Sequence, residues 1–158
     1  MLALALMLLL AVPAAAESER FLSVATEWAN VRASPTTRAE VLWEAPRFEP
    51  LRILETRLPW YRVVDRADDS GWIHASVVRR SASVVVTAEA ANLRAAPGMH
   101  ADPEWVLDAG YTLRVLLRQG PWIKVDDEDG AIGWIHVSVV WGDTLQVDDE
   151  TAAAGFSG

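Results

Sequence analysis

Cysteine is absent from the 158 residues, so the chain can form no disulfide and offers no thiol nucleophile. Histidine is scarce, with His74, His100 and His136 as its only copies. A zinc site needs three or four ligands in a closed arrangement, and no cluster of histidines and carboxylates supplies them. We therefore expect no metal site and no cofactor.

Basic residues are also in the minority. Lys and Arg number 14 against 22 Asp and Glu, which gives a net charge of −8 and a pI of about 4.8. No basic cluster stands out beyond Arg79-Arg80, so nucleic acid is excluded as the expected partner. No glycine-rich phosphate loop and no set of nucleophile and base is recognisable. The chain is predicted not to be an enzyme and to have no catalytic residues.

No long window shows a helical period, so the chain is predicted to be all-β. Short apolar runs alternate with turn residues, as in a small antiparallel barrel. The first half offers six such strands, at 22–26, 42–44, 51–54, 61–64, 72–73 and 77–78. The second half offers six more, at 84–88, 105–107, 113–117, 122–125, 132–135 and 139–140.

The two halves are copies of one module. The phrase Asn30–Pro35 returns at Asn92–Pro97, and Gly71–His74 returns at Gly133–His136, both 62 residues later. A repeat of this kind defines the organisation of the chain. We place one module at 22–79 and the other at 84–142. The polar linker between them is short, so we expect the modules to pack against each other.

The two ends differ from the repeats. Residues 1–16 hold an eleven-residue apolar run, Leu2–Val12, that ends at Ala14-Ala15-Ala16, which is typical of a cleaved signal peptide. A retained N-terminal anchor is the alternative, although the run is shorter than the roughly 20 residues that span a bilayer. We expect an exported protein, periplasmic or extracellular, with no membrane span after cleavage. Residues 143–158 are acidic and low in apolar content, so we interpret them as a disordered tail.

Tryptophan is the abundant functional candidate. Of eight Trp, six fall in the matched pairs 43/105, 60/122 and 72/134. Trp serves both cores and recognition grooves because it joins a large apolar face to one donor. We expect Trp43 and Trp105 to be partly buried. Trp60 and Trp122 each follow a proline at a junction of loop and strand, where side chains often border a groove.

Two further features have a structural interpretation. His74 and His136 hold equivalent positions directly after a strand, so we expect their imidazoles to satisfy backbone groups of a turn. The acidic run Asp126–Gly130 does not have the ligand spacing of a calcium-binding EF-hand loop. We interpret it as a solvated hairpin tip.

The repeated phrases resemble the bacterial SH3-like domain family. The resemblance rests on A-N-V-R-A-S-P at 29–35, P-W-Y-R-V at 59–63, G-W-I-H-A-S-V-V at 71–78 and their copies in the second repeat. It implies two small SH3-like β-barrels in tandem, used as a non-catalytic binding module of the cell envelope. Ala96 and Pro103 depart from the pattern, which puts a shared ligand in doubt.

By this resemblance, a peptide groove would run between the first loop of a repeat and the loop before Trp60 or Trp122. The candidate binding residues are Trp60, Tyr61, Trp72, Arg32, Trp122 and Trp134. The implied partner is a cell-wall peptide or an envelope protein. The alternative is a structural pair that docks onto another envelope protein without a groove of its own. The sequence does not define the oligomeric state.

Charge distinguishes the copies. Residues 24–78 have seven basic and eight acidic side chains, a net charge of −1, whereas residues 86–140 have four and eight, a net charge of −4. For an anionic ligand the first repeat, with Arg32, Arg38 and Arg62, is the better host. The second repeat could then act as a stabilising partner.

Overall fold

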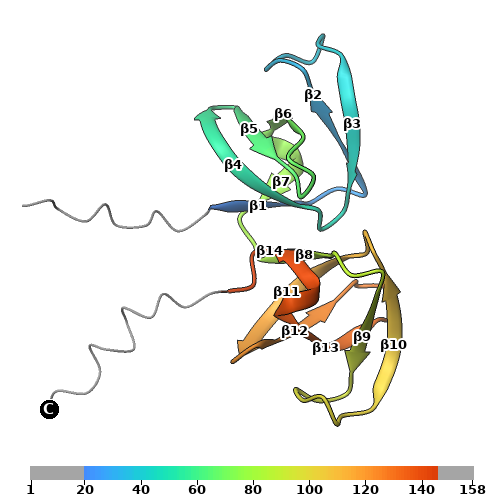
Figure 1. Ribbon diagram of the computed structural model, residues 1–158. Coiled ribbons are helices and arrows are strands. Elements are labelled where there is room, and N and C mark those ends of the chain that lie inside the picture. The colour runs from blue at the N-terminus through green and yellow to red at the C-terminus, as the bar shows by residue number, and fades with distance from the viewer. Residues whose placement is uncertain (1–19, 146–158) are drawn as a thin grey trace, which may run out of the picture.

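The computed structural model describes residues 20–145, which form two seven-stranded antiparallel sheets (Figure 1). We call the first sheet barrel 1 and the second barrel 2. Barrel 1 contains β1 (Phe21–Val24), β2 (Trp28–Arg32), β3 (Val41–Pro46), β4 (Pro50–Arg57), β5 (Trp60–Val64), β6 (Ser70–His74) and β7 (Val78–Arg79). Barrel 2 contains β8 (Ser83–Val86), β9 (Ala90–Arg94), β10 (Pro103–Asp108), β11 (Thr112–Gln119), β12 (Trp122–Asp126), β13 (Ile132–His136) and β14 (Val140–Gly142).

The two sheets have the same topology. Their strand orders are β3-β2-β6-β5-β4-β1-β7 and β10-β9-β13-β12-β11-β8-β14. A single turn of 3₁₀ helix precedes the last strand of each, η1 (Ala75–Val77) and η2 (Val137–Val139). The predicted all-β fold with two small tandem barrels is confirmed.

Strands β2 and β9 were missed by the sequence prediction. They are formed by the repeated phrase that begins with Ala-Asn, two residues that are depleted in strands. Their burial nevertheless alternates, so that Ala29 and Val31 face the core while Trp28 and Asn30 are exposed. Pairing with β3 and β6 therefore fixes a strand that local propensity does not indicate.

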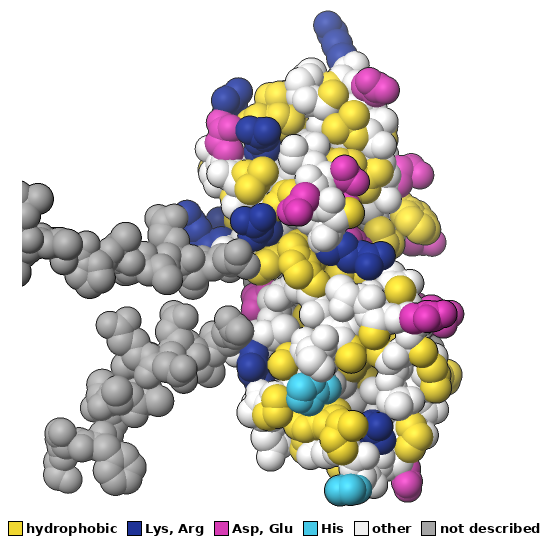
Figure 2. Space-filling model, in the orientation of Figure 1, with side chains coloured by type: hydrophobic (Ala, Val, Ile, Leu, Met, Phe, Trp, Pro, Cys, Tyr) yellow, Lys and Arg dark blue, Asp and Glu magenta, His cyan; other side chains and the backbone are white. Residues whose placement is uncertain are grey.

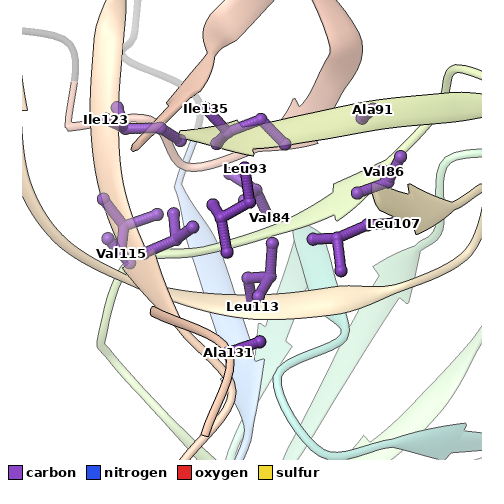
Figure 3. Packing of buried hydrophobic residues seen from close by; sticks show 12 residues of the cluster. Val84, Val86, Ala91, Leu93, Leu107, Leu113, Val115, Ile123, Ala131 and Ile135 are labelled. Atoms are coloured by element: carbon purple, nitrogen blue, oxygen red, sulfur yellow. The ribbon is translucent and has the colours of Figure 1, made fainter. Parts of the chain in front are cut away.

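Each barrel encloses its own hydrophobic core. The core of barrel 2 brings twelve buried residues together, among them Leu93, Leu113 and Ile135, which come from β9, β11 and β13 (Figure 3). The core of barrel 1 is smaller and has Leu22, Leu51 and Ile73 among its members. Because inward residues alternate with outward ones, the same strands carry a second face toward solvent.

A glycine allows a close approach between two strands in each barrel. A Cβ at Gly133 would lie 2.8 Å from the Arg94 carbonyl oxygen and 2.9 Å from Leu93 Cγ. A Cβ at Gly71 would lie 2.6 Å from Val31 Cγ1. The Gly-Trp phrase of both repeats therefore permits β6 and β13 to approach β2 and β9.

The two barrels contact each other, as the short linker predicted. Thr112 Oγ1 donates a hydrogen bond to the Arg47 carbonyl oxygen at 2.7 Å, and the Arg47 guanidinium pairs with Glu128 at 3.1 Å. Phe21 meets Trp141 edge to face, with ring centroids 5.2 Å apart. Charged side chains of both signs lie along this junction (Figure 2). The contacts between the barrels therefore combine aromatic packing with a hydrogen bond and an ion pair.

The matched tryptophans Trp43 and Trp105 have different environments. Trp43 is half-buried against the core of barrel 1, as expected. Trp105 is 49% exposed, so the expectation is wrong for this residue. It lies on β10, where only Leu107 is buried.

The predicted tail begins with residues that are bound to barrel 2. The Asp143 amide donates to the Ser83 carbonyl oxygen, and the Arg118 guanidinium donates to Thr144 Oγ1 at 2.7 Å. The rest of the predicted tail and the predicted signal peptide lie outside the described residues. In residues 20–145 no helix is long and apolar enough to cross a membrane.

Candidate functional site

The outward faces of β2, β6 and β5 form the candidate site of barrel 1. Alternation puts Trp28, Asn30 and Arg32 on the outer side of β2. The register pairs Arg32 with Trp72 of β6, and Trp60 of β5 with His74 of β6. Side chains from three neighbouring strands therefore share one surface.

Trp60 and His74 form a packed pair at the centre of this surface. Their rings meet edge to face with centroids 5.1 Å apart, and Trp60 is only 9% exposed. His74 Nδ1 accepts a hydrogen bond from the Ser76 amide at 3.1 Å and so caps the turn η1. The prediction that this imidazole satisfies turn backbone groups is confirmed.

A groove of about 380 Å³ lies beside this pair. We call it the barrel 1 groove. Its lining consists of Trp28, Ala29, Asn30, Arg32, Thr37, Trp60, His74, Ser76 and Val77. Two predicted residues, Arg32 and Trp60, thus lie together in it, between the first loop and the strand that follows Pro59. Trp28, Asn30 and His74 are lining residues that were not among the predicted binding residues.

Trp28 is the most accessible aromatic wall of the groove, with 59% of its surface exposed. The corresponding residue of the second repeat is Ala90, since the offset is 62. A tryptophan present in only one copy is not required by the shared fold. That mismatch is the sequence signal that could have identified Trp28.

Tyr61 and Trp72 do not line the groove. Tyr61 follows Trp60 directly on a strand, so it points to the opposite face and packs against the core. Trp72 shares the outer face, but the guanidinium carbon of Arg57 lies 5.0 Å from its ring centroid. Trp72 is therefore covered by a cation–π contact.

Arg32 has a structural bond in addition to its place in the groove. Its guanidinium donates to the Ala39 carbonyl oxygen at 2.9 Å, and Arg94 donates to the Ala101 carbonyl oxygen at 2.8 Å. Because both repeats make this bond, we assign it a structural role, which is to hold the first loop of each repeat against the strand before it. The remaining N–H donors of Arg32 can still face the groove.

Residues 25–80 and 87–142 each match the family model described as the bacterial SH3 domain. The chain belongs to the bacterial SH3 domain family. The resemblance seen in the repeated phrases is thereby confirmed for both copies.

Solved structures with similarity to this SH3 pair have low sequence identity. NlpC2 from Trichomonas vaginalis is 15% identical over 85% of this chain and 52% of its own, with a TM-score of 0.36. NlpC1 from the same organism is 14% identical over 83% of this chain and 48% of its own, with a TM-score of 0.37. An NlpC/P60 family protein from Bacillus cereus ATCC 10987 is 11% identical over 77% of this chain and 55% of its own, with a TM-score of 0.34. The chain spans about half the length of these proteins, and no curated protein matches it.

Barrel 2 keeps the packed tryptophan and histidine pair of the site but lacks the exposed tryptophan. Trp122 and His136 meet at 5.1 Å in the same geometry as the first pair, and Trp122 is buried. Trp134 is half-buried and pairs in register with Arg94. Ala90 stands where barrel 1 has Trp28. Trp122 and Trp134 therefore belong to a surface that lacks an exposed indole such as Trp28 provides in the barrel 1 groove.

In the acidic turn of barrel 2, the carboxylate of Asp127 is hydrogen-bonded to other groups of the same barrel. Asp127 accepts hydrogen bonds from the Tyr111 hydroxyl and from the amides of Asp129 and Ala131. Burial raises the pKa of Asp127, but these hydrogen bonds together outweigh burial and lower it. The bond to Asp127 also raises the pKa of Tyr111 to about 12. Among the described residues no group of three or more histidines, cysteines and carboxylates could hold a metal ion.

Proposed function

We propose that the protein is an exported, non-catalytic binding module that recognises a cell-wall peptide through the barrel 1 groove. The observation that carries this proposal is the exposed indole of Trp28 beside the packed Trp60 and His74 pair. An exposed aromatic ring next to a rigid one offers a large contact area at little entropic cost.

The polar groups of the groove suit a peptide backbone. Asn30 is exposed and carries both a donor and an acceptor, and Arg32 adds cationic donors. Together they can bond the carbonyl and amide groups or a carboxylate of an extended chain. Membership in the bacterial SH3 family and the predicted signal peptide favour a ligand of the cell envelope.

Barrel 2 takes a supporting role in this proposal. It keeps the Trp122 and His136 pair but has Ala90 in place of Trp28. Loss of one aromatic wall should weaken peptide binding, because buried aromatic anchors contribute most to such interfaces. We therefore assign binding to barrel 1 and stabilisation of the pair to barrel 2.

Co-sedimentation with purified peptidoglycan tests the proposal. Wild-type protein should sediment with the wall, and Trp28→Ala and Asn30→Ala should each reduce the bound fraction. Both side chains are exposed, so neither change should unfold the barrel. Asn92→Ala is the matched control at the equivalent position of barrel 2 and should bind as wild type.

Failure of the wild-type protein to sediment with the wall would remove the cell-wall proposal. That result would favour the alternative, a structural pair that docks onto an envelope protein. Equal losses in Asn30→Ala and Asn92→Ala would refute the assignment to barrel 1.

A further inference from the structure

A second cavity lies between the barrels and shares no lining residue with the barrel 1 groove. We call it the inter-barrel cleft, and its volume is about 560 Å³. Barrel 1 contributes residues of β3 and of the two turns that precede β4 and β6, and barrel 2 contributes β8, β14 and two turn residues. The lining is Trp43, Glu44, Ala45, Pro46, Glu49, Asp65, Arg66 and Ala67 with Val85, Thr87, Gly110 and Trp141.

Two half-buried indoles, one from each barrel, line the cleft. Trp43 packs against the core of barrel 1. Trp141 of β14 is held by its edge-to-face contact with Phe21. Both are therefore fixed by packing on one side while they border the cavity on the other. Indole faces attract cations through their negative potential.

The charged lining of the cleft is predominantly acidic. Glu44, Glu49 and Asp65 face a single cation, Arg66, and the lining residues of barrel 2 add no charged group. Glu49 makes no side-chain hydrogen bond or ion pair with the described residues, although it is half-buried. A carboxylate that is partly removed from water and has no partner destabilises the folded state, and a bound cation would reduce that cost.

Comparison of the repeats shows what is unusual about Glu49. The equivalent residue of barrel 2 is Tyr111, and the equivalent of Asp65 is Asp127. In barrel 2 the Tyr111 hydroxyl donates to Asp127, so the two positions satisfy each other. In barrel 1 two acids occupy these positions. Burial first, and then the charge of Asp65, raise the pKa of Glu49 to about 7, and Arg66 partly opposes the shift.

We infer that the inter-barrel cleft binds a ligand that carries a primary ammonium group. The ammonium group would pair with the carboxylates of Glu49 and Asp65, and the carbon chain would lie against Trp43 and Trp141. A metal ion is disfavoured because no three carboxylates or histidines among the described residues are grouped so that they could hold one. An ammonium group on an apolar stem satisfies both the acids and the indoles.

Binding should strengthen as pH rises through neutrality, because Glu49 loses its proton in this range. The other charged groups that line the cleft with it are Glu44, Asp65 and Arg66. The pH dependence should therefore disappear in Glu49→Gln.

Titration of the full chain with Nα-acetyl-lysine amide tests the inference, with the indole N–H signals observed by NMR. Trp43→Phe and Trp141→Phe assign the two signals. We expect saturable shifts of both at pH 8, and no such shifts with the Nα,Nε-diacetylated amide, which lacks the charge. Glu49→Gln should weaken binding about tenfold, as expected for loss of a hydrogen bond to a charged group.

Two controls separate this site from the proposed function. Glu40→Gln removes the same charge from an exposed loop and should bind as wild type. Trp28→Ala should leave the amine titration unchanged, whatever its effect on wall binding. Absence of saturable shifts in the wild type would overturn the inference, as would equal affinity in wild type and Glu49→Gln.

Discussion

The ionisation of Glu49 should make the stability of the protein depend on pH around neutrality. Burial, followed by the nearby Asp65, raises the pKa of Glu49 from its ordinary value of 4.5 to about 7. The folded state therefore holds the proton more tightly than the unfolded state. Its contribution to stability is fully present below about pH 4.5 and is lost as the pH rises through about 7.

The size of the effect follows from the two pKa values. The difference between 4.5 and about 7, at 1.36 kcal/mol per pKa unit, corresponds to about 3 kcal/mol. Residual contact of the carboxyl with solvent reduces this, so we expect about 1 to 3 kcal/mol. Glu49→Gln keeps the shape of the protonated side chain but cannot ionise.

Urea unfolding followed by tryptophan fluorescence measures this prediction. The stability advantage of Glu49→Gln over wild type should grow by about 1 to 3 kcal/mol between pH 5 and pH 8. Glu40→Gln, in an exposed loop, should differ from wild type equally at both pH values. A Glu49→Gln difference that is the same at pH 5 and pH 8 would contradict a raised pKa of Glu49 in the folded state.

Three further predictions concern the framework. Gly133→Ala should destabilise barrel 2 by about 1 to 3 kcal/mol, because the added Cβ would lie 2.8 Å from the Arg94 carbonyl oxygen. Gly98→Ala is the control and should leave Tm unchanged, because no atom lies within 4 Å of the added Cβ. Equal Tm values for the two variants would contradict this. Leu113→Ala should lower the free energy of unfolding by about 2 to 5 kcal/mol in urea, and a loss under about 1 kcal/mol would contradict its place in the core. His136→Ala should lower the free energy of unfolding by about 1 kcal/mol in the same urea assay, because the Ser138 amide loses its acceptor. An unchanged urea midpoint would contradict a stabilising role of His136 as the N-cap of η2.

The tandem barrels could be predicted because the repeat places apolar residues at the same positions twice. The strand Trp28–Arg32 could not, because Ala29 and Asn30 have low strand propensity and only pairing with β3 and β6 makes the segment extended. Such pairing is a tertiary effect. Local sequence signals do not contain it.

The candidate site was predicted in part. Trp60 and Arg32 lie together in the groove, but Tyr61 was grouped with Trp60 although neighbours on a strand point to opposite faces. Trp28 was not predicted because it corresponds to Ala90 in the second repeat and so belongs to no matched pair of tryptophans. The inter-barrel cleft depends on how the two barrels sit against each other, which the repeat pattern does not specify.

We propose that barrel 1 alone recognises a cell-wall peptide, and calorimetric titration with a purified soluble stem peptide measures this binding. We predict saturable binding at one site per chain, weakened at least tenfold by Trp28→Ala, as expected for an aromatic anchor. Trp105→Ala, an exposed tryptophan of barrel 2, should leave the affinity unchanged. Two equivalent sites per chain, or an affinity that Trp28→Ala does not alter, would contradict binding by barrel 1 alone.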